Sequence, residues 1–212
     1  MTGVIFDLDG VIVSTDNCHY LGWKQMADEE SIYFDRQINE RLRGVSRMES
    51  LEIILEKAEK SYSQQEKDAM AQRKNAYYVK LIGSLTADDI LPGAMNVLNL
   101  LKANEIKIAI GSSSKNTPII LKQIGLDHTF DAIADGNHIT NSKPDPEVFL
   151  LAAKLLGLAP ANCLVVEDAD AGVQAAIAGN MRVLGVGSAA QNEKADFTAA
   201  DLSKIDFATI LE

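Results

Sequence analysis

Cysteine is scarce in this sequence, and long apolar runs are missing from it. The two cysteines, Cys18 and Cys163, lie far apart and form no C-x-x-C pair, which argues against a disulfide framework or a zinc site. We interpret both as small buried apolar residues. No apolar run approaches the roughly 18 to 20 residues needed to cross a bilayer. The N-terminus also lacks the basic-then-apolar layout of a signal peptide, so we expect a cytoplasmic protein.

Positive charge is also in short supply. The chain has 20 Lys and Arg against 30 Asp and Glu, which argues against nucleic acid and anionic membranes as partners because both favour a basic surface. Residues 15–86 carry 11 basic and 12 acidic side chains, whereas the remainder carries 9 and 18. This difference indicates an acidic domain, residues 1–14 plus 87–212, that is interrupted by a nearly neutral inserted domain, residues 15–86.

The two regions also differ in the period of their apolar residues. Helix signals alone occupy residues 16–82, where apolar residues recur at helical spacing from Leu51 to Ala58 and Ser63–Glu66 has the form of a capping box. Elsewhere strands and helices alternate. We expect strands at 4–6, 106–111, 130–134, 163–166 and 182–186, and helices at 91–101, 117–124, 146–156, 171–179 and 201–212. This alternation predicts an α/β fold, a parallel sheet with helices on both faces and an all-helical insertion.

Polar residues gather where the predicted strands end. In the run DLDG, Asp7 and Asp9 follow the first strand and point to the same side, because side chains alternate along an extended chain. Two like charges placed in this way need a cation between them or a proton on one of them. Further polar residues follow later strands or precede a helix: Ser112, Ser113, Ser114, Lys143, Glu167 and Asp168.

Each of these clusters also has a purely structural interpretation. Serines after a strand can cap a helix, an acidic pair before a helix can favour its dipole, and a lysine before proline can be a solvated loop residue. In an open parallel sheet, however, ligands bind beyond the carboxyl ends of the strands. The convergence of all four clusters on that edge therefore favours a functional site.

These motifs, in this order, resemble those of the haloacid dehalogenase superfamily: DxDG after the first strand, Ser112 after the second, Lys143 before a proline, and Glu167-Asp168 after a later strand. The resemblance implies a Rossmann-like core with a helical cap domain inserted at residues 15–86. It also implies that Asp7 is a nucleophile that becomes phosphorylated, that the side chain of Asp9 is a general acid and base, and that Ser112 and Lys143 bind the transferring phosphoryl group. Mg²⁺ is the implied cofactor, held by Asp7, the backbone carbonyl of Asp9, Glu167 and Asp168.

Further runs are similar to the β-phosphoglucomutase family within that superfamily: GVSR at 44–47, RKN at 73–75, SSSKN at 112–116 and DAIAD at 131–135. That resemblance implies an isomerase that interconverts β-glucose 1-phosphate and glucose 6-phosphate through a 1,6-bisphosphate. Arg47 is the candidate for gripping the distal phosphate, since a guanidinium binds phosphate through two parallel hydrogen bonds; the alternative is an exposed charge at a helix start. The other candidate substrate contacts are Gly44, Val45, Ser114, Lys115 and Asn116.

Three residues of the insertion have a weaker signal. His19 and Trp23 are four apart on a predicted helix and share a face. By resemblance, His19 steers Asp9, Trp23 lines the entrance, and Lys74 reaches the site from the cap; simple packing is the alternative for the His–Trp pair. We interpret His128 and His138 as surface residues, because neither has neighbours with metal-ligand spacing.

Two other functions share parts of this pattern. A sugar-phosphate or phosphoglycolate phosphatase needs the same core motifs, so only the cap residues favour the mutase. A non-catalytic sugar-phosphate sensor is expected to lack Asp7 or Asp9, and both are present. We rank the mutase first, with small sugar phosphates as partners and a monomer as the expected state.

Overall fold

A single parallel sheet forms the centre of one part of the molecule. The computed structural model describes residues 1–43 and 45–211, and their strands pair in the order β3-β2-β1-β4-β5-β6. All five neighbouring pairs are parallel. The strands are β1 (Gly3–Phe6), β2 (Lys107–Gly111), β3 (Ala132–Ala134), β4 (Cys163–Glu167), β5 (Arg182–Gly185) and β6 (Phe197–Thr198). The predicted α/β class is confirmed; β6 escaped prediction because two residues are too few to show a period.

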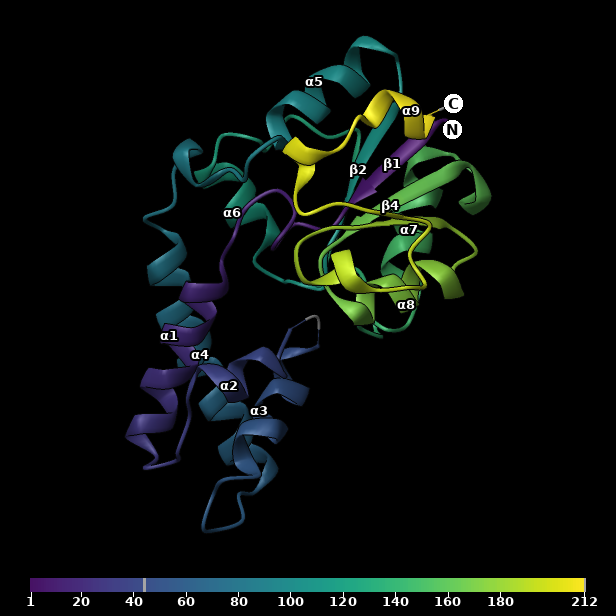
Figure 1. Cartoon of the computed structure of the whole chain (residues 1–212). Coiled ribbons are helices and arrows are strands. Elements are labelled where there is room, and N and C mark those ends of the chain that lie inside the picture. The colour runs from purple at the N-terminus through teal and green to yellow at the C-terminus, as the bar shows by residue number, and fades with distance from the viewer. Residues whose placement is uncertain (44, 212) are drawn as a thin grey trace.

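Helices cover both faces of the sheet, as the alternation of its side chains requires. On one face, Val4 and Phe6 belong to a core shared with α5 (Ala94–Ala103), α6 (Thr117–Gln123) and α9 (Phe207–Leu211). On the other face, Ile5 and Val165 pack against α7 (Glu147–Leu156) and α8 (Asp170–Ala178). Short 3-10 turns lie at Ala87–Asp89, Pro160–Asn162, Gly187–Gln191 and Leu202–Lys204. We call these strands and helices the sheet part (Figure 1).

Two of the predicted helices differ in the structure. The continuous helix predicted at 201–212 is wrong, because the Asp201 side chain caps a single 3-10 turn and Ile205 is extended (ψ 139°) before α9 begins at Phe207. The helix predicted to start at 91 begins at Ala94. Gly93, just before it, has φ 85°, a left-handed conformation that glycine adopts without the steric cost of a side chain.

Four helices form the second part of the molecule, to one side of the sheet (Figure 1). They are α1 (Asp16–Glu29), α2 (Arg36–Glu40), α3 (Arg47–Leu55) and α4 (Gln64–Ile82). This four-helix part has its own core around Trp23, Met26, Leu51, Ile54 and Met70. The sequence begins α3 and α4 in the same way, with capping boxes at Ser46 and Ser63 that satisfy backbone N–H groups of the first turn.

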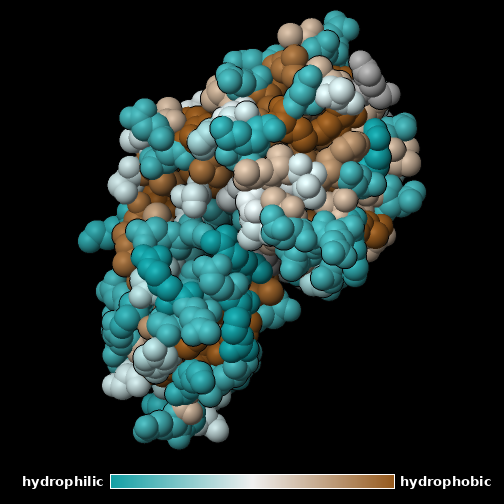
Figure 2. Space-filling view, in the orientation of Figure 1, coloured by the Kyte–Doolittle hydropathy of each residue, from teal (hydrophilic) through white to brown (hydrophobic). Residues whose placement is uncertain are grey.

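The two segments that connect the parts lie side by side. Val13 forms an antiparallel bridge with Ile90, and the backbone N–H of Leu91 donates to the carbonyl of Ile12 at 2.9 Å. The chain therefore leaves β1 through DLDG and crosses to the helices within a few residues. Figure 2 shows hydrophilic side chains gathered over the four-helix part and hydrophobic ones mainly over the sheet part. Across 1–43 and 45–211, the helices lack the combination of length and apolar character that a membrane crossing requires.

Candidate active site

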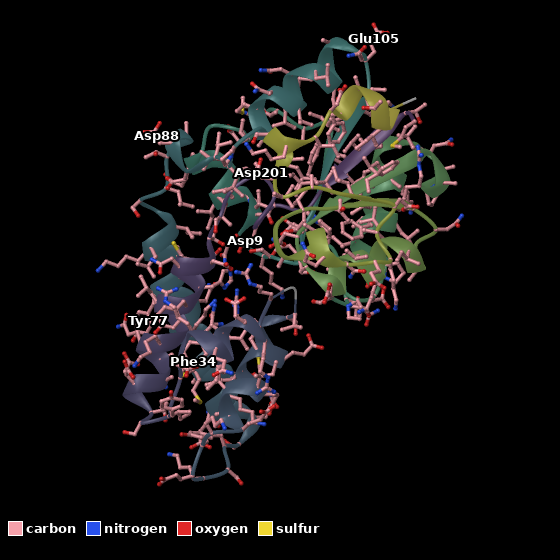
Figure 3. The ribbon with its side chains drawn as sticks, viewed as in Figure 1. Asp9, Phe34, Tyr77, Asp88, Glu105 and Asp201 are labelled. Atoms are coloured by element: carbon pink, nitrogen blue, oxygen red, sulfur yellow. The ribbon has the colours of Figure 1, made fainter. Side chains whose placement is uncertain are left out.

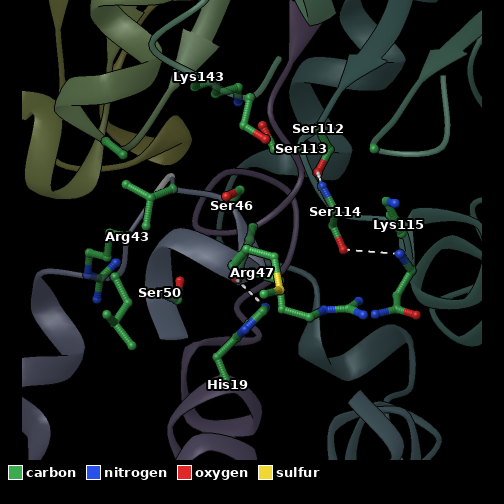
Figure 4. Close-up of a pocket in the computed structure, with 18 of the residues that line it drawn as sticks. His19, Arg43, Ser46, Arg47, Ser50, Ser112, Ser113, Ser114, Lys115 and Lys143 are labelled. Carbon is green, nitrogen blue, oxygen red and sulfur yellow. Dashed lines mark hydrogen bonds and ion pairs between the residues drawn. The ribbon is translucent and has the colours of Figure 1, made fainter. Parts of the chain in front are cut away.

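A cavity of about 590 Å³ opens where the sheet part meets the four-helix part. The carboxyl ends of β1, β2 and β4 line one side, and residues of α1, α3 and α4 line the other. In Figure 4, Lys143 and Ser112 lie on the side of the sheet, and His19 and Arg47 face them from the helices. Every site residue predicted from the sequence lines this cavity, except Gly44, which lies outside the described residues.

Asp7 and Lys143 form the buried centre of the site. Lys143 Nζ donates to Asp7 Oδ1 at 2.6 Å and to Glu167 Oε1 at 2.9 Å, and its side chain is 2% exposed. Burial alone would lower the pKa of Lys143, but the two carboxylates outweigh it and raise the pKa instead. The lysine therefore stays charged beside Asp7. A permanent cation here suits the binding of an anionic group beside Asp7.

Three carboxylates gather around this lysine. Oxygens of Asp7, Glu167 and Asp168 lie within 4.8 Å of one another, and all three residues are buried. Burial raises the pKa of Glu167 and of Asp168, and mutual repulsion adds to the shift, with Lys143 opposing it at Glu167. Crowded carboxylate oxygens of this kind fit a hard divalent cation such as Mg²⁺.

Two glycines make room for this acidic cluster. A Cβ at Gly10, the glycine of DLDG, would lie 2.1 Å from Asp168 Oδ2, and a Cβ at Gly172 would lie 1.9 Å from Glu167 Oε1. Gly10 also has φ 79°, so any other residue there would be strained as well as crowded. The glycine of DLDG is therefore required by the acidic cluster that it adjoins.

The side chain of Asp9 is held by the segment that leads into α1. Thr15 donates to it twice, from its backbone N–H to Oδ1 at 2.5 Å and from its hydroxyl to Oδ2 at 2.7 Å. Tyr78 of α4 donates in turn to the Thr15 hydroxyl at 3.0 Å. Removal from water raises the pKa of Asp9 to about 6, against the opposing hydrogen bonds from Thr15. A carboxyl with this pKa can hold or release a proton near neutral pH, and Figure 3 places it at the junction of the two parts.

His19 and Lys74 approach Asp9 from the helices. Lys74 Nζ, on a side chain that is almost fully buried, lies at hydrogen-bond distance, 2.9 Å, from His19 Nδ1. The charged form of lysine has only donors, so with this form Nδ1 accepts and the ring proton is on Nε2, 4.0 Å from Asp9 Oδ2. Burial and the charge of Lys74 lower the pKa of His19 well below its usual range. Lys74 also lies over the rings of Trp23 at 4.8 Å and Tyr78 at 4.6 Å. The imidazole is thus a neutral donor oriented toward Asp9.

The loop after β2 places a row of polar side chains along the cavity. Ser112 Oγ accepts from the backbone N–H of Ser114 at 3.2 Å, and Ser114 Oγ accepts from that of Asn116 at 3.2 Å. Each serine thus fixes the residue two positions further on, in the manner of an ST turn. Ser112 and Asn116 are buried, and the exposed Lys115 lines the cavity beside them.

Arg47, the first residue of α3, is the cation that the four-helix part presents opposite this loop. Its Nη2 donates to Asn75 Oδ1 at 2.8 Å, and the same oxygen accepts from Asn116 Nδ2 at 3.0 Å. Burial lowers the pKa of the Arg47 guanidinium, which still remains charged at neutral pH. Val45 lines the cavity two residues before it.

Four residues of this region escaped the sequence analysis as site residues. Thr15 and Tyr78 hold Asp9, and Asn75 joins Arg47 to Asn116. Arg43 pairs with Asp16, with Glu40 at 2.9 Å and with Asp168 at 3.4 Å, and so connects the two parts. The sequence held a signal for two of the four, since Asn75 lies in the RKN run and Arg43 directly precedes GVSR.

Comparisons with known proteins decide the family. A model of the haloacid dehalogenase-like hydrolase family matches residues 1–180. The chain belongs to that family. Within the family, the chain is 44% identical to a β-phosphoglucomutase of Bacillus subtilis over 97% of this chain and 92% of the relative. The family assignment made from the sequence is confirmed.

This chain is also similar to a solved structure of the family and to phosphatases within it. A crystal structure of β-phosphoglucomutase from Clostridium difficile superposes with a TM-score of 0.93 at 44% identity, covering 99% of this chain and 95% of that one. A phosphorylated carbohydrates phosphatase of Thermotoga maritima is 30% identical over 88% of this chain and 85% of its own length. Both kinds of activity therefore occur among the relatives.

Proposed function

We propose that this chain is a β-phosphoglucomutase, an isomerase that interconverts β-D-glucose 1-phosphate and D-glucose 6-phosphate through an aspartyl-phosphate enzyme and a β-glucose 1,6-bisphosphate. One observation carries the proposal. Asp7 and Lys143 share a single cavity with a second cationic group, Arg47, on the opposite wall. A phosphatase needs only the first of these two phosphate sites, whereas a bisphosphate intermediate needs both.

In the proposed reaction Asp7 attacks phosphorus through a carboxylate oxygen. The phosphorus–oxygen bond to the sugar breaks, and Asp9 gives its proton to the departing sugar oxygen. In the second half, Asp9 takes the proton of a sugar hydroxyl as that oxygen attacks the aspartyl phosphate. The pKa of about 6 at Asp9 supports both directions, because neither state of the carboxyl is costly near neutral pH. Lys143 and Ser112 stabilise the charge on the transferring group.

Asp7, Glu167, Asp168 and the backbone carbonyl of Asp9 would hold Mg²⁺ in this proposal. When bound, the ion offsets the repulsion between the Asp7 carboxylate and an anionic phosphate. The fit rests on the buried cluster of carboxylate oxygens. Burial, and then repulsion from neighbouring carboxylates, raises the pKa of Glu167 and of Asp168, and a bound cation would oppose both effects. Arg43 already contacts Asp168 from the four-helix part, so the cluster also touches the cap.

Residues 15–86 act as the cap domain and residues 1–14 plus 87–212 as the catalytic core. The cap contributes Arg47 for the distal phosphate, with Ser114, Lys115 and Asn116 from the core around the substrate. Gly44 and Val45 bring backbone close to the sugar. His19 and Lys74 orient Asp9 from the cap, and Trp23 packs beneath Lys74. A cap that covers the cavity also keeps water away from the phosphoenzyme.

The test is incubation with pure β-glucose 1-phosphate, Mg²⁺ and a trace of the 1,6-bisphosphate. Sustained formation of glucose 6-phosphate with little free phosphate is the expected result. Stoichiometric release of phosphate without glucose 6-phosphate would overturn the proposal. That second result would match the phosphatases of the family, one of which is 30% identical to this chain.

A further inference from the structure

Asn75 lies on α4 at the junction of the two parts, and its side-chain oxygen is hydrogen-bonded to a residue from each part. Its Oδ1 accepts hydrogen bonds from Arg47 Nη2 at 2.8 Å and from Asn116 Nδ2 at 3.0 Å. Arg47 begins α3 in the four-helix part, and Asn116 precedes α6 in the sheet part. An amide oxygen has two lone pairs, so a single carbonyl can serve both donors. The distance between Arg47 and Asn116 is thus set by one shared acceptor.

Asn75 itself stands behind the cavity wall. Arg47 and Asn116 both line the cavity, whereas Asn75 is absent from its lining among the described residues. Each donor uses one N–H on Asn75 and keeps others for a ligand, since a guanidinium has five N–H groups and an amide has two. On the proposed function, these remaining donors face the phosphate that is distant from Asp7.

The acceptor is neutral, and this matters for the charge of Arg47. Elsewhere in the four-helix part, Arg41, Arg43 and Arg73 are paired with carboxylates, and the exposed Arg36 donates to the amide oxygen of Asn17. Within the part of the chain that the structure describes, Arg47 has no such pair within 4.0 Å. An amide carbonyl orients the guanidinium without offsetting its charge, which stays available to an anion. A carboxylate in the same place would also accept from Arg47, but it would offset the charge of the guanidinium and repel a phosphate.

We propose that Asn75 is a positioning residue that holds Arg47 and Asn116 in register as one distal phosphate site and so gives the enzyme its preference for substrates with a second phosphate. The inference rests on the proposed function and deepens it. In this proposal Asn75 does not contact the substrate and takes no part in the chemistry at Asp7.

The test compares Asn75→Asp and Asn75→Ala with the wild type. Two rates are measured with matched Mg²⁺: consumption of β-glucose 1,6-bisphosphate, which needs both phosphate sites, and consumption of acetyl phosphate, which needs only the site at Asp7. Asn75→Asp keeps both hydrogen bonds and the shape of the side chain but adds a negative charge. Its kcat/KM for the bisphosphate should fall about 10- to 150-fold relative to acetyl phosphate, mostly through KM, the size expected when a charge-assisted contact is lost.

Asn75→Ala should lower the same ratio by a smaller factor of about 2 to 12, the size of a typical net hydrogen-bond contribution, because the charge of Arg47 stays available to the phosphate and only its orientation is lost. Gln65→Glu is the matched control, because it makes the same amide-to-carboxylate change on an exposed residue of α4 outside the cavity lining. It should leave the ratio of the two rates unchanged. Thermal unfolding of each variant monitors the fold.

An unchanged ratio of the two kcat/KM values in Asn75→Asp would overturn the inference. The aspartate still accepts both hydrogen bonds, so an unchanged ratio would mean that Asn75 has a structural role only. An equal fall in both rates would also overturn it and would place Asn75 in the fold of the whole site. Bisphosphate consumption is measurable whether the phosphoryl group goes to sugar or to water. Product analysis of the wild type therefore tests the proposed function separately.

Discussion

Lys74 should lower the stability of the fold, so its replacement by methionine should raise it. The ammonium is almost fully buried, and burial together with the charge of Arg47 lowers its pKa from 10.5 to about 7. At about 1.36 kcal/mol per pH unit, this shift corresponds to about 4–5 kcal/mol of disfavoured charge. Contacts with the rings of Trp23 and Tyr78, each about 0.5–2 kcal/mol, offset part of it. We expect Lys74→Met to raise the free energy of unfolding at pH 7 by about 1–4 kcal/mol.

The gain should depend on pH in a defined direction. A lysine whose pKa is lowered by folding binds fewer protons in the folded state, so the stability of the wild type rises as pH increases from about 7 toward 10.5. The difference between Lys74→Met and the wild type is therefore largest at or below pH 7 and shrinks toward alkaline pH. Urea unfolding at a series of pH values between 6 and 10 measures it.

Lys80→Met, an exposed change on the same helix, is the control and should show no such trend. A loss of stability in Lys74→Met that is the same at every pH would contradict this prediction, because it would show that the lysine stabilises the cap through contacts that do not depend on its charge. The expected gain in stability should come with a loss of turnover, as is common when a strained site residue is replaced.

Three further outcomes are expected. Asp9→Asn should keep most of the affinity for Mg²⁺, since the ligand proposed there is a backbone carbonyl, and should lower the rate of phosphoryl transfer by about 10²–10⁴-fold. Titration calorimetry and kinetics measure the two quantities, and an equal loss of both would show that Asp9 acts mainly as a metal ligand. Arg47→Ala should lower kcat/KM for β-glucose 1-phosphate by about 10- to 150-fold, near the upper end for a bidentate contact. Acetyl phosphate should still phosphorylate Asp7 at nearly the wild-type rate. An equal fall in both rates would show that Arg47 does not act at the distal phosphate. EDTA should stop turnover and added Mg²⁺ restore it, and activity that persists in EDTA would exclude the proposed metal.

The sequence carried most of the information about the sheet edge. Asp7, Ser112 and Glu167 each end or follow a buried strand, and parallel strands bring their carboxyl ends to one side whatever the details of packing. The glycine of DLDG was also visible, although the contact that requires it, with Asp168, could be seen only in three dimensions. Local pattern and sheet topology are enough for this half of the site.

The other half depends on how the four-helix part meets the sheet. The contacts of Asn75 with Arg47 and Asn116, and of Arg43 with Asp168, join residues 28 to 125 positions apart. No periodicity encodes such distances, because they follow from the path of the two connecting segments. Tyr78 is a similar case, since an aromatic residue on a buried helix face predicts packing and not a hydrogen bond to Thr15. Prediction of β6 and of the interrupted C-terminal helix failed for a different reason, the shortness of these elements.

The most direct measurement follows the phosphoryl group itself. Radiolabelled acetyl phosphate and Mg²⁺ should load the label onto Asp7 of the wild type, and the Asp7→Asn variant should take up none because an amide is not a competent nucleophile. The loaded enzyme is then separated and mixed with β-glucose 1-phosphate. We predict that most of the label appears on the sugar 6-oxygen, as bisphosphate and then as glucose 6-phosphate. Label that leaves only as inorganic phosphate, at a rate that the sugar does not change, would contradict the account.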